Sequence, residues 1–293
     1  MLVRTASAAF ALVAFAAPAS AQREVTLAST SLEYTPSAEV KDASSDAEFS
    51  SVRTTVGVLV PIPLGRRTTL LLAPRYRTWN YSGDGAAGAQ DTRVHDIGFL
   101  ATVYRRLSKS WSLASTIGVG LATDFDDVDG GDVRVTGAIS AERVFGPRLR
   151  AGVGLAGSYV FGDLLPVPLL LFDWLPTDRV HVVGVLPQRL RARFRLAPWL
   201  LLGAGADVDG NRFSARIAAP EVSSIALSRG TVQVRGSARL FDKLWLVLYA
   251  GHTVFRRLKA FDDDGTELAD LTLQQSPLVG FAVEFRVPLR PAR

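Results

Sequence analysis

The chain has 293 residues, a formal net charge of +5 at pH 7 and no cysteine, and 48% of its residues are hydrophobic. The lack of cysteine excludes a small scaffold held by disulfides. No apolar run after the N-terminal region reaches the ~18 to 20 residues that a membrane-spanning helix needs. The hydrophobic content therefore serves either a soluble core or short strands that contact lipid on alternate residues.

Residues 1–21 have the order of features of a cleaved secretory signal peptide. Arg4 supplies a positive charge, residues 8–17 are apolar, and Ala19-Ser20-Ala21 fits the small-x-small cleavage rule. We expect cleavage after Ala21 and one mature domain over residues 22–293; the alternative is a buried N-terminal helix. No cysteine stands at the cleavage site, which excludes a lipoprotein anchor.

The mature chain alternates apolar and polar residues with a period of two, which predicts β-strands. Residues 189–196 are the clearest case, because four arginines alternate there with Leu190, Ala192, Phe194 and Leu196. The strands are longer than those of most soluble sheets and close to the length of a tilted transmembrane strand. In chain order we place fourteen, at 27–36, 49–61, 68–81, 94–106, 111–124, 132–145, 148–161, 168–176, 179–187, 189–197, 199–208, 230–241, 244–257 and 273–289. Twelve is the alternative if 179–197 is misread, since Pro187 lies in its middle.

The connections between these strands fall into two classes that largely alternate. Short ones lie at 107–111, 145–149, 176–179, 196–200 and 240–245, and longer polar ones at 37–48, 82–93, 124–132, 209–229 and 258–272. This is the pattern of short periplasmic turns and long extracellular loops. Eight aromatic residues near strand ends are expected to form interfacial girdles: Trp79, Tyr81, Trp111, Phe145, Trp174, Trp199, Trp245 and Phe255. The sequence therefore predicts an all-β protein, a single closed antiparallel transmembrane β-barrel of the bacterial outer membrane.

Several short motifs carry a family resemblance. They are Leu32-Glu33-Tyr34, residues 120–125 with Asp132, residues 161–166, residues 170–179, Leu186-Pro187 and residues 209–213. With these the chain resembles an uncharacterised family of outer-membrane β-barrel proteins, known as domain of unknown function 6268. Two features depart from the expected pattern: Phe172 stands where a small residue is expected, and residues 289–293 lack a terminal aromatic residue. The family has no established activity, so the resemblance implies no catalytic residue and no cofactor.

Arginines dominate the polar faces of the predicted strands. An isolated arginine in the middle of a bilayer costs ~2 to 4 kcal/mol, so these faces are expected to turn toward the barrel interior. The residues expected to line this interior are Arg53, Arg75, Arg77, Arg134, Arg150, Arg189, Arg191, Arg193, Arg195, Arg235, Arg239 and Arg286, with Asp96, Glu142, Asp207 and Glu284. The excess of positive charge predicts a passive pore or transport barrel that prefers anions. The alternative is a closed structural or interaction barrel with functional extracellular loops.

An acidic loop contains Asp124, Asp126, Asp127, Asp129 and Asp132. Its spacing does not fit an EF-hand and no glutamate closes it, so we expect no metal site there. A solvated loop is the simpler interpretation; the other is a loop whose bound divalent cations bridge lipopolysaccharide phosphates.

The partners expected for this barrel are outer-membrane lipid, lipopolysaccharide and the assembly machinery that inserts barrels. The spacing of His95, His181 and His252 gives no Ser–His or Asp–His arrangement, so an enzyme such as a lipid hydrolase is only the third alternative. Nucleic-acid binding is excluded, because the basic residues lie within strands of an exported chain.

Overall fold

The computed structural model describes residues 24–41, 48–84, 92–125, 128, 132–160, 163–214 and 222–288. The expected signal peptide, residues 1–21, lies outside the described residues. Within these ranges no helix is long and apolar enough to cross a bilayer. The strands are β1 (Glu24–Lys41), β2 (Glu48–Val58), β3 (Val60–Pro63), β4 (Thr68–Asp84), β5 (Thr92–Arg106), β6 (Trp111–Thr123), β7 (Val133–Val144), β8 (Leu149–Val160), β9 (Asp163–Trp174), β10 (Val180–Leu186), β11 (Arg189–Ala197), β12 (Leu200–Ser214), β13 (Ser224–Arg239), β14 (Leu244–Phe261), β15 (Glu267–Leu273) and β16 (Pro277–Pro288).

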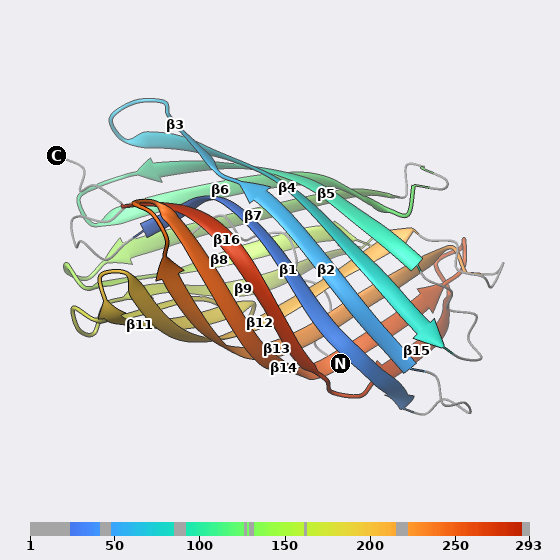
Figure 1. Cartoon of the computed structure of the whole chain (residues 1–293). Helices are drawn as coiled ribbons and strands as arrows, with labels where there is room; N and C mark the ends of the chain where they lie inside the picture. Colours follow the sequence, from blue (N-terminus) through green and yellow to red (C-terminus); the bar gives the residue numbers. More distant parts are fainter. Residues whose placement is uncertain are drawn as a thin grey trace.

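The strands form one antiparallel sheet that closes on itself (Figure 1). β1 pairs with β2 on one side and with β16 on the other, and β16 pairs in turn with β14. β2 and β3 share one position in the ring, and β15 and β16 share another, which gives a closed barrel of 14 strands. The prediction of a fourteen-stranded closed barrel is confirmed. Closure satisfies the hydrogen bonds that an edge strand would leave unpaired.

The short β10–β11 hairpin decides between fourteen and twelve strands. Pro187 and Gln188 form its turn, with Gln188 N–H donating to the Val185 carbonyl at 2.8 Å. β10 pairs with β9 and β11 along its length. Pro187 therefore ends a strand, where its missing N–H removes no ladder hydrogen bond, and the twelve-strand alternative is discarded.

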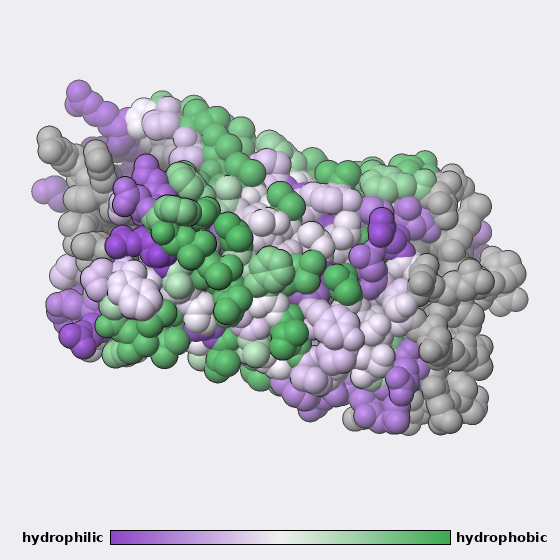
Figure 2. All heavy atoms as spheres, viewed as in Figure 1, coloured by the Kyte–Doolittle hydropathy of each residue, from purple (hydrophilic) through white to green (hydrophobic). Residues whose placement is uncertain are grey.

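The outward faces of the strands are apolar and exposed. Ile117 is 61% exposed, Val153 65% and Val234 64%, whereas Ala114 and Val247, on inward faces, are 1% exposed. Figure 2 shows hydrophobic residues spread over the middle of this outer surface and hydrophilic ones gathered toward its ends. A soluble monomer does not expose apolar surface on this scale, whereas a barrel in a bilayer places such a belt against lipid.

The height of the barrel wall differs around the ring. β10 has 7 residues, whereas β14 has 18. Residues 209–229 and 258–272, predicted as loops, contain the ends of β12, β13 and β14 and all of β15 except its last residue. We call the end of the barrel that carries these extensions the loop end, and the opposite end the turn end.

The extension of β12 bends across the barrel. The last pair of the β11–β12 ladder toward the loop end is Arg189 with Asp207, so β12 continues beyond Asp207 without β11 beside it. Its last residue, Ser214, forms a parallel bridge to Thr123 of β6, and the Asp124 N–H donates to the Ser214 carbonyl at 3.1 Å. Because β6 and β12 lie far apart in the ring, this contact narrows the loop end.

The aromatic girdle is present only in part. At the turn end Trp111, Phe145 and Trp199 are 44%, 58% and 54% exposed. The prediction is wrong for Trp79 and Trp245, which are 6% and 2% exposed. These two side chains have the parity of their inward-facing neighbours Arg77 and Val247 and therefore point into the barrel.

Candidate functional site

Side chains from strands that are not neighbours meet inside the barrel. Arg53 of β2 donates through Nη1 to Asp209 Oδ2 of β12 at 2.7 Å. β2 pairs with β1 and β4, and β12 pairs with β11 and β13, so this contact crosses the interior. It identifies the faces of β2 and β12 that turn inward.

Asp209 is one centre of a network of buried ion pairs. It also accepts from Arg77 Nη1 at 3.3 Å, and Arg77 Nε donates to Asp96 Oδ2 at 2.9 Å. Arg75 Nη2 reaches the same Asp96 oxygen at 3.2 Å. Sequence analysis gave Arg75, Arg77 and Asp96 as interior residues, and the structure brings these three together.

Glu33 is the second centre of this network. It accepts from Arg53 Nη2 at 3.1 Å and pairs with Arg229 Nη2 at 2.6 Å. Four guanidinium groups and three carboxylates thus neutralise most of one another's charge, which the low dielectric of a buried site requires. We call this set the ion-pair layer: Glu33, Arg53, Arg75, Arg77, Asp96, Asp209 and Arg229.

Two cavities that share lining residues lie on the turn-end side of the ion-pair layer, and their walls are rich in arginine. The larger has a volume of about 370 Å³ and the smaller about 80 Å³, and Arg191 and Arg193 line both. We call them the basic cavities. Their charged lining residues are Arg75, Arg189, Arg191, Arg193, Arg235 and Arg286, with Glu24, Asp173 and Glu284. Arg75 is already paired with Asp96. With Asp207 beside the cavities, the other five guanidinium groups face four carboxylates.

The arginines of β11 differ in how they are held. Arg189 Nε donates to Asp207 Oδ1 at 2.8 Å, and Arg191 Nη2 reaches the same oxygen at 3.3 Å. Gln233 Nε2 donates a further hydrogen bond to Asp207 Oδ2 at 2.7 Å. Arg193, two residues further on, has no ion-pair partner among the described residues. An anion in the cavity therefore meets at least one guanidinium whose charge no ion pair neutralises.

Aromatic rings support two further guanidinium groups of the smaller cavity. Arg235 lies 5.0 Å from the centre of the Tyr249 ring and donates through Nε to Gln233 at 3.2 Å. Arg286 lies 4.7 Å from the Trp245 ring, and its Nε donates to Glu284 Oε2 at 2.7 Å. Such stacking orients a guanidinium and leaves its edge free to donate.

The loop end of the interior is filled by apolar side chains. Phe213, at the end of β12, is fully buried, and its ring meets Trp79 edge-on at 5.1 Å between centres. We call this group the mouth cluster: Trp79, Val94, Ala122, Phe213 and Ile225. It fastens the bent extension of β12 and β13 onto β4, β5 and β6.

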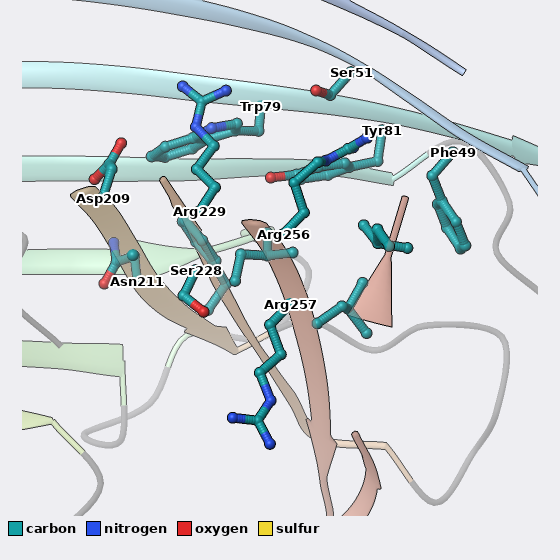
Figure 3. A pocket seen from close by; sticks show the side chains of 15 residues that line it. Phe49, Ser51, Trp79, Tyr81, Asp209, Asn211, Ser228, Arg229, Arg256 and Arg257 are labelled. Carbon is teal, nitrogen blue, oxygen red and sulfur yellow. The ribbon is translucent and has the colours of Figure 1, made fainter. Parts of the chain in front are cut away.

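A smaller pocket of about 40 Å³ lies between the mouth cluster and the extended hairpins (Figure 3). Phe49, Trp79 and Tyr81 form one wall, and β12, β13 and β14 form the other. Arg256 of β14 is 6% exposed and lines this space, which we call the aromatic pocket. Its volume corresponds to about three water molecules.

The remaining predicted interior residues lie apart from these cavities. Arg134 donates through Nη2 to the Arg212 carbonyl at 2.8 Å, near the loop end. Glu142 pairs with Arg150 at 3.4 Å, and both are buried. Arg195 and Arg239 lie at the turn ends of β11 and β13.

The predicted acidic loop is described only at its two ends. Asp124 follows β6 directly, and Asp132, which is buried, precedes β7. Asp126, Asp127 and Asp129 lie outside the described residues. Over the ranges that the structure describes, no group of three acidic or histidine side chains is placed to hold a metal ion.

The histidines occupy three different settings. His95 faces outward, with its Nδ1 2.8 Å from the Tyr76 hydroxyl, and His252 donates through Nδ1 to the Thr253 carbonyl at 2.9 Å. His181 lies 2.9 Å from Asp173 of the neighbouring strand, an Asp–His pair that spacing alone did not reveal. The pair lines the larger basic cavity, and among the described residues no serine or threonine hydroxyl hydrogen-bonds to His181.

Besides Glu24 and Asp173 of the larger basic cavity, the described charged residues of the interior that escaped sequence analysis include Glu33, Asp209, Arg229 and Arg256. Glu33 and Asp209 lie in the Leu32–Tyr34 and 209–213 motifs, so the motifs pointed to them without giving a role. Arg229 lies in a segment predicted as a loop. A β-bulge conceals Arg256: Gly230 pairs with Phe255 but Thr231 with Thr253, so Val254 is unpaired and the parity of β14 changes there.

The closed ring, the apolar outer belt and the charged interior define an outer-membrane β-barrel, located in the bacterial outer membrane. The chain belongs to the family described as domain of unknown function DUF6268, whose model matches residues 17–269. The resemblance found in the sequence is thereby confirmed.

Outer-membrane channels are among the solved structures of similar shape. The COG4313 outer membrane channel from Pseudomonas putida F1 is 15% identical, with a TM-score of 0.46 over 90% of this chain and 96% of that chain. The NanC porin is 6% identical, with a TM-score of 0.41 over 89% of this chain and 100% of that chain. The TodX monoaromatic hydrocarbon channel, in a deltaS2 mutant, is 7% identical, with a TM-score of 0.39 over 89% and 90%. No curated protein matches the sequence significantly.

Proposed function

We propose that this barrel is a passive pore of the outer membrane whose interior favours anions. The excess of guanidinium groups around the basic cavities carries the proposal, since five arginines besides Arg75 face four carboxylates there. The proposal assigns no enzymatic activity to the barrel.

The size of the electrostatic effect supports a preference for anions. A unit anion 4 Å from one guanidinium gains about 4 kcal/mol at an effective dielectric constant of 20. The hydration that the ion loses offsets much of this gain, yet a cation at the same place would be repelled by a similar amount. Arg193 and Arg235 contribute most to this difference, because no carboxylate forms an ion pair with either of them within the described residues.

The ion-pair layer would control passage between the basic cavities and the loop end. Arg53 and Arg77 share Asp209 across the interior, so a solute moving along the barrel axis has to pass beside these side chains. Each contact of Asp209 joins strands that are far apart in the ring. Small movements of β12 would therefore open or close this layer.

Planar-bilayer recordings in a KCl gradient test the proposal. We expect single-channel currents and a reversal potential on the anion-preferring side for the purified protein. A triple variant, Arg191→Gln with Arg193→Gln and Arg235→Gln, moves the reversal potential toward zero or beyond. Arg179→Gln, an exposed arginine of a turn, is the matched control and leaves it unchanged. A cation preference of the unchanged protein would refute the proposal.

A closed structural or interaction barrel is the second candidate. The parallel bridge between Ser214 and Thr123 and the mouth cluster favour it, because both bring opposite walls together at the loop end. In the same recordings, this candidate predicts no current at any salt concentration or voltage.

A further inference from the structure

The guanidinium of Arg256 lies in an unusual setting. Arg256 is 6% exposed, its Nη1 atom has no hydrogen-bond partner, and no carboxylate pairs with it among the described residues. Its direct partner across the β13–β14 ladder is another cation, Arg229. Like charges directly opposite each other are destabilising, and a buried charge without a partner costs several kcal/mol.

The neighbouring cation does not share its counterion with Arg256. Arg229 Nη2 pairs with Glu33 at 2.6 Å, within the ion-pair layer. Arg257, the next residue of β14, pairs with Asp270 of β15. Figure 3 shows that Arg256 and Arg257 point to opposite sides, with the Arg256 guanidinium beside the Tyr81 ring. Both neighbours are thus neutralised, and Arg256 is not.

Backbone geometry aims Arg256 into the aromatic pocket. Thr253 is buried and faces inward, so simple alternation would turn Arg256 toward the outside and Arg257 toward the inside. The bulge at Val254 reverses this order. β-Bulges often re-aim a side chain near a functional site, and here the bulge directs a cation into a space with aromatic walls.

The dimensions of the aromatic pocket select the ligand. About 40 Å³ has room for a carboxylate group of three heavy atoms, so that a short alkyl chain attached to it lies along the open side of the pocket, whereas a benzene ring occupies an apolar cavity of about 150 Å³. Phe49, Trp79 and Tyr81 offer apolar contact beside the guanidinium. A carboxylate accepts two parallel hydrogen bonds from an arginine. An inorganic anion can accept the same hydrogen bonds, but it has no apolar part to contact the aromatic walls.

We propose that the aromatic pocket binds small organic monocarboxylates, with the carboxylate on Arg256 and the short alkyl chain against Trp79 and Tyr81. The inference deepens the proposed function and rests on it for the idea that such an acid then enters the barrel. The binding site itself is tested without any measurement of transport.

Propionate is the probe, with propionamide as its neutral counterpart and inorganic phosphate as an anion without an alkyl chain. Saturation-transfer NMR on the folded protein in detergent is expected to show saturable binding of propionate and none of propionamide or phosphate. Arg256→Met weakens propionate binding about tenfold or more, since a charge-assisted hydrogen bond is lost. Arg179→Gln, an exposed arginine at the turn end, leaves binding unchanged.

A second readout does not depend on the fold of a charge variant. 3-Bromopropionate, whose bromine quenches tryptophan on contact, is expected to quench part of the fluorescence of the unchanged protein in a saturable way. This component is absent in Trp79→Phe. In the same detergent Arg256→Met unfolds at the same temperature as the parent protein or a higher one, because it removes an unpaired buried charge.

Three results would overturn the proposal: no saturable propionate binding, equal binding by Arg256→Met, or binding of phosphate in preference to propionate. Binding of propionate by a protein that passes no current would contradict the pore and leave the site standing. Anion-selective current without propionate binding would contradict the site and leave the pore standing.

Discussion

The two halves of the barrel interior treat their arginines differently. In the loop-end half, Glu33, Asp96 and Asp209 neutralise four arginines, and the mouth cluster draws opposite walls together. In the turn-end half, Arg193 has no ion-pair partner among the described residues, and the basic cavities, of about 370 and 80 Å³, lie beside it. The comparison shows that one interior combines a stabilised, nearly neutral layer with a charged, poorly filled one. Under the proposed function, we expect the first layer to contribute most to stability and the second to anion selectivity.

The largest effect on this contrast is expected from Phe213→Ala. It removes a fully buried ring from the mouth cluster, and such a loss costs about 3 to 5 kcal/mol of unfolding free energy. The end of β12 then loses its anchor on β4 and β6. Urea unfolding in micelles should show the loss of stability, and bilayer recordings should show a larger conductance.

The control for this change is Phe241→Ala, in a turn, where the ring is 71% exposed. It should alter neither quantity. A Phe213→Ala protein with unchanged stability and conductance would mean that the mouth cluster does not hold the loop end.

Asp209→Asn is expected to have a somewhat smaller effect. Breaking a buried ion pair costs about 3 to 5 kcal/mol, and the side chain of Asp209 is 20% exposed, so we expect the lower limit, about 3 kcal/mol. Arg53 and Arg77 lose a shared acceptor, so the interior also gains one net positive charge. Urea unfolding measures the first consequence and the reversal potential the second.

Asp178→Asn is the matched control. Asp178 pairs with Arg148 on the surface and is 89% exposed, so its loss changes stability by less than about 1 kcal/mol. If both variants were equally stable, the ion-pair layer would not be a centre of stability.

The smallest effect concerns the extension beyond the membrane-spanning part. Hydrogen bonds from Arg257 lower the pKa of Asp270 below its ordinary value. A carboxylate with a lowered pKa in the folded state stabilises the protein above its unfolded-state pKa of about 3.9, and this contribution is lost as the pH falls through the folded-state value.

Arg257→Gln should therefore lower the thermal midpoint slightly at neutral pH and leave it unchanged in acid below the folded-state pKa of Asp270, where this carboxyl is protonated in both states. Because the pair is exposed, the difference at neutral pH is small. Lys109→Gln, in a turn, should show no difference at either pH. A larger deficit of Arg257→Gln in acid than at neutral pH would contradict this assignment.

The sequence predicted the barrel because alternation is a local signal. The arginines of β11 all have one parity and the apolar residues between them have the other, along the whole strand. The face of each side chain could therefore be assigned, and the strands could be counted even across Pro187. Trp79 and Trp245 were misplaced because their position near strand ends was given more weight than their parity.

The partners of the interior charges were not predictable in this way. Asp209 meets Arg53 and Arg77 only because the sheet curves until β2, β4 and β12 face one another, and curvature leaves no mark in a short sequence window. Arg256 was hidden by one unpaired residue, Val254, which shifts the parity of everything after it. Alternation predicts which face of the sheet a side chain lies on, whereas β-bulges and the closure of the barrel determine which other side chains it contacts.

The central claim is that an aqueous anion reaches Arg193. The chain has no native cysteine, so Arg193→Cys provides a single thiol for a negatively charged methanethiosulfonate reagent. We expect rapid modification in membranes and a lower current afterwards, while a cysteine in place of Val234, on the lipid-facing side, stays unmodified. Failure of the reagent to reach position 193 from either side of the membrane would contradict the account.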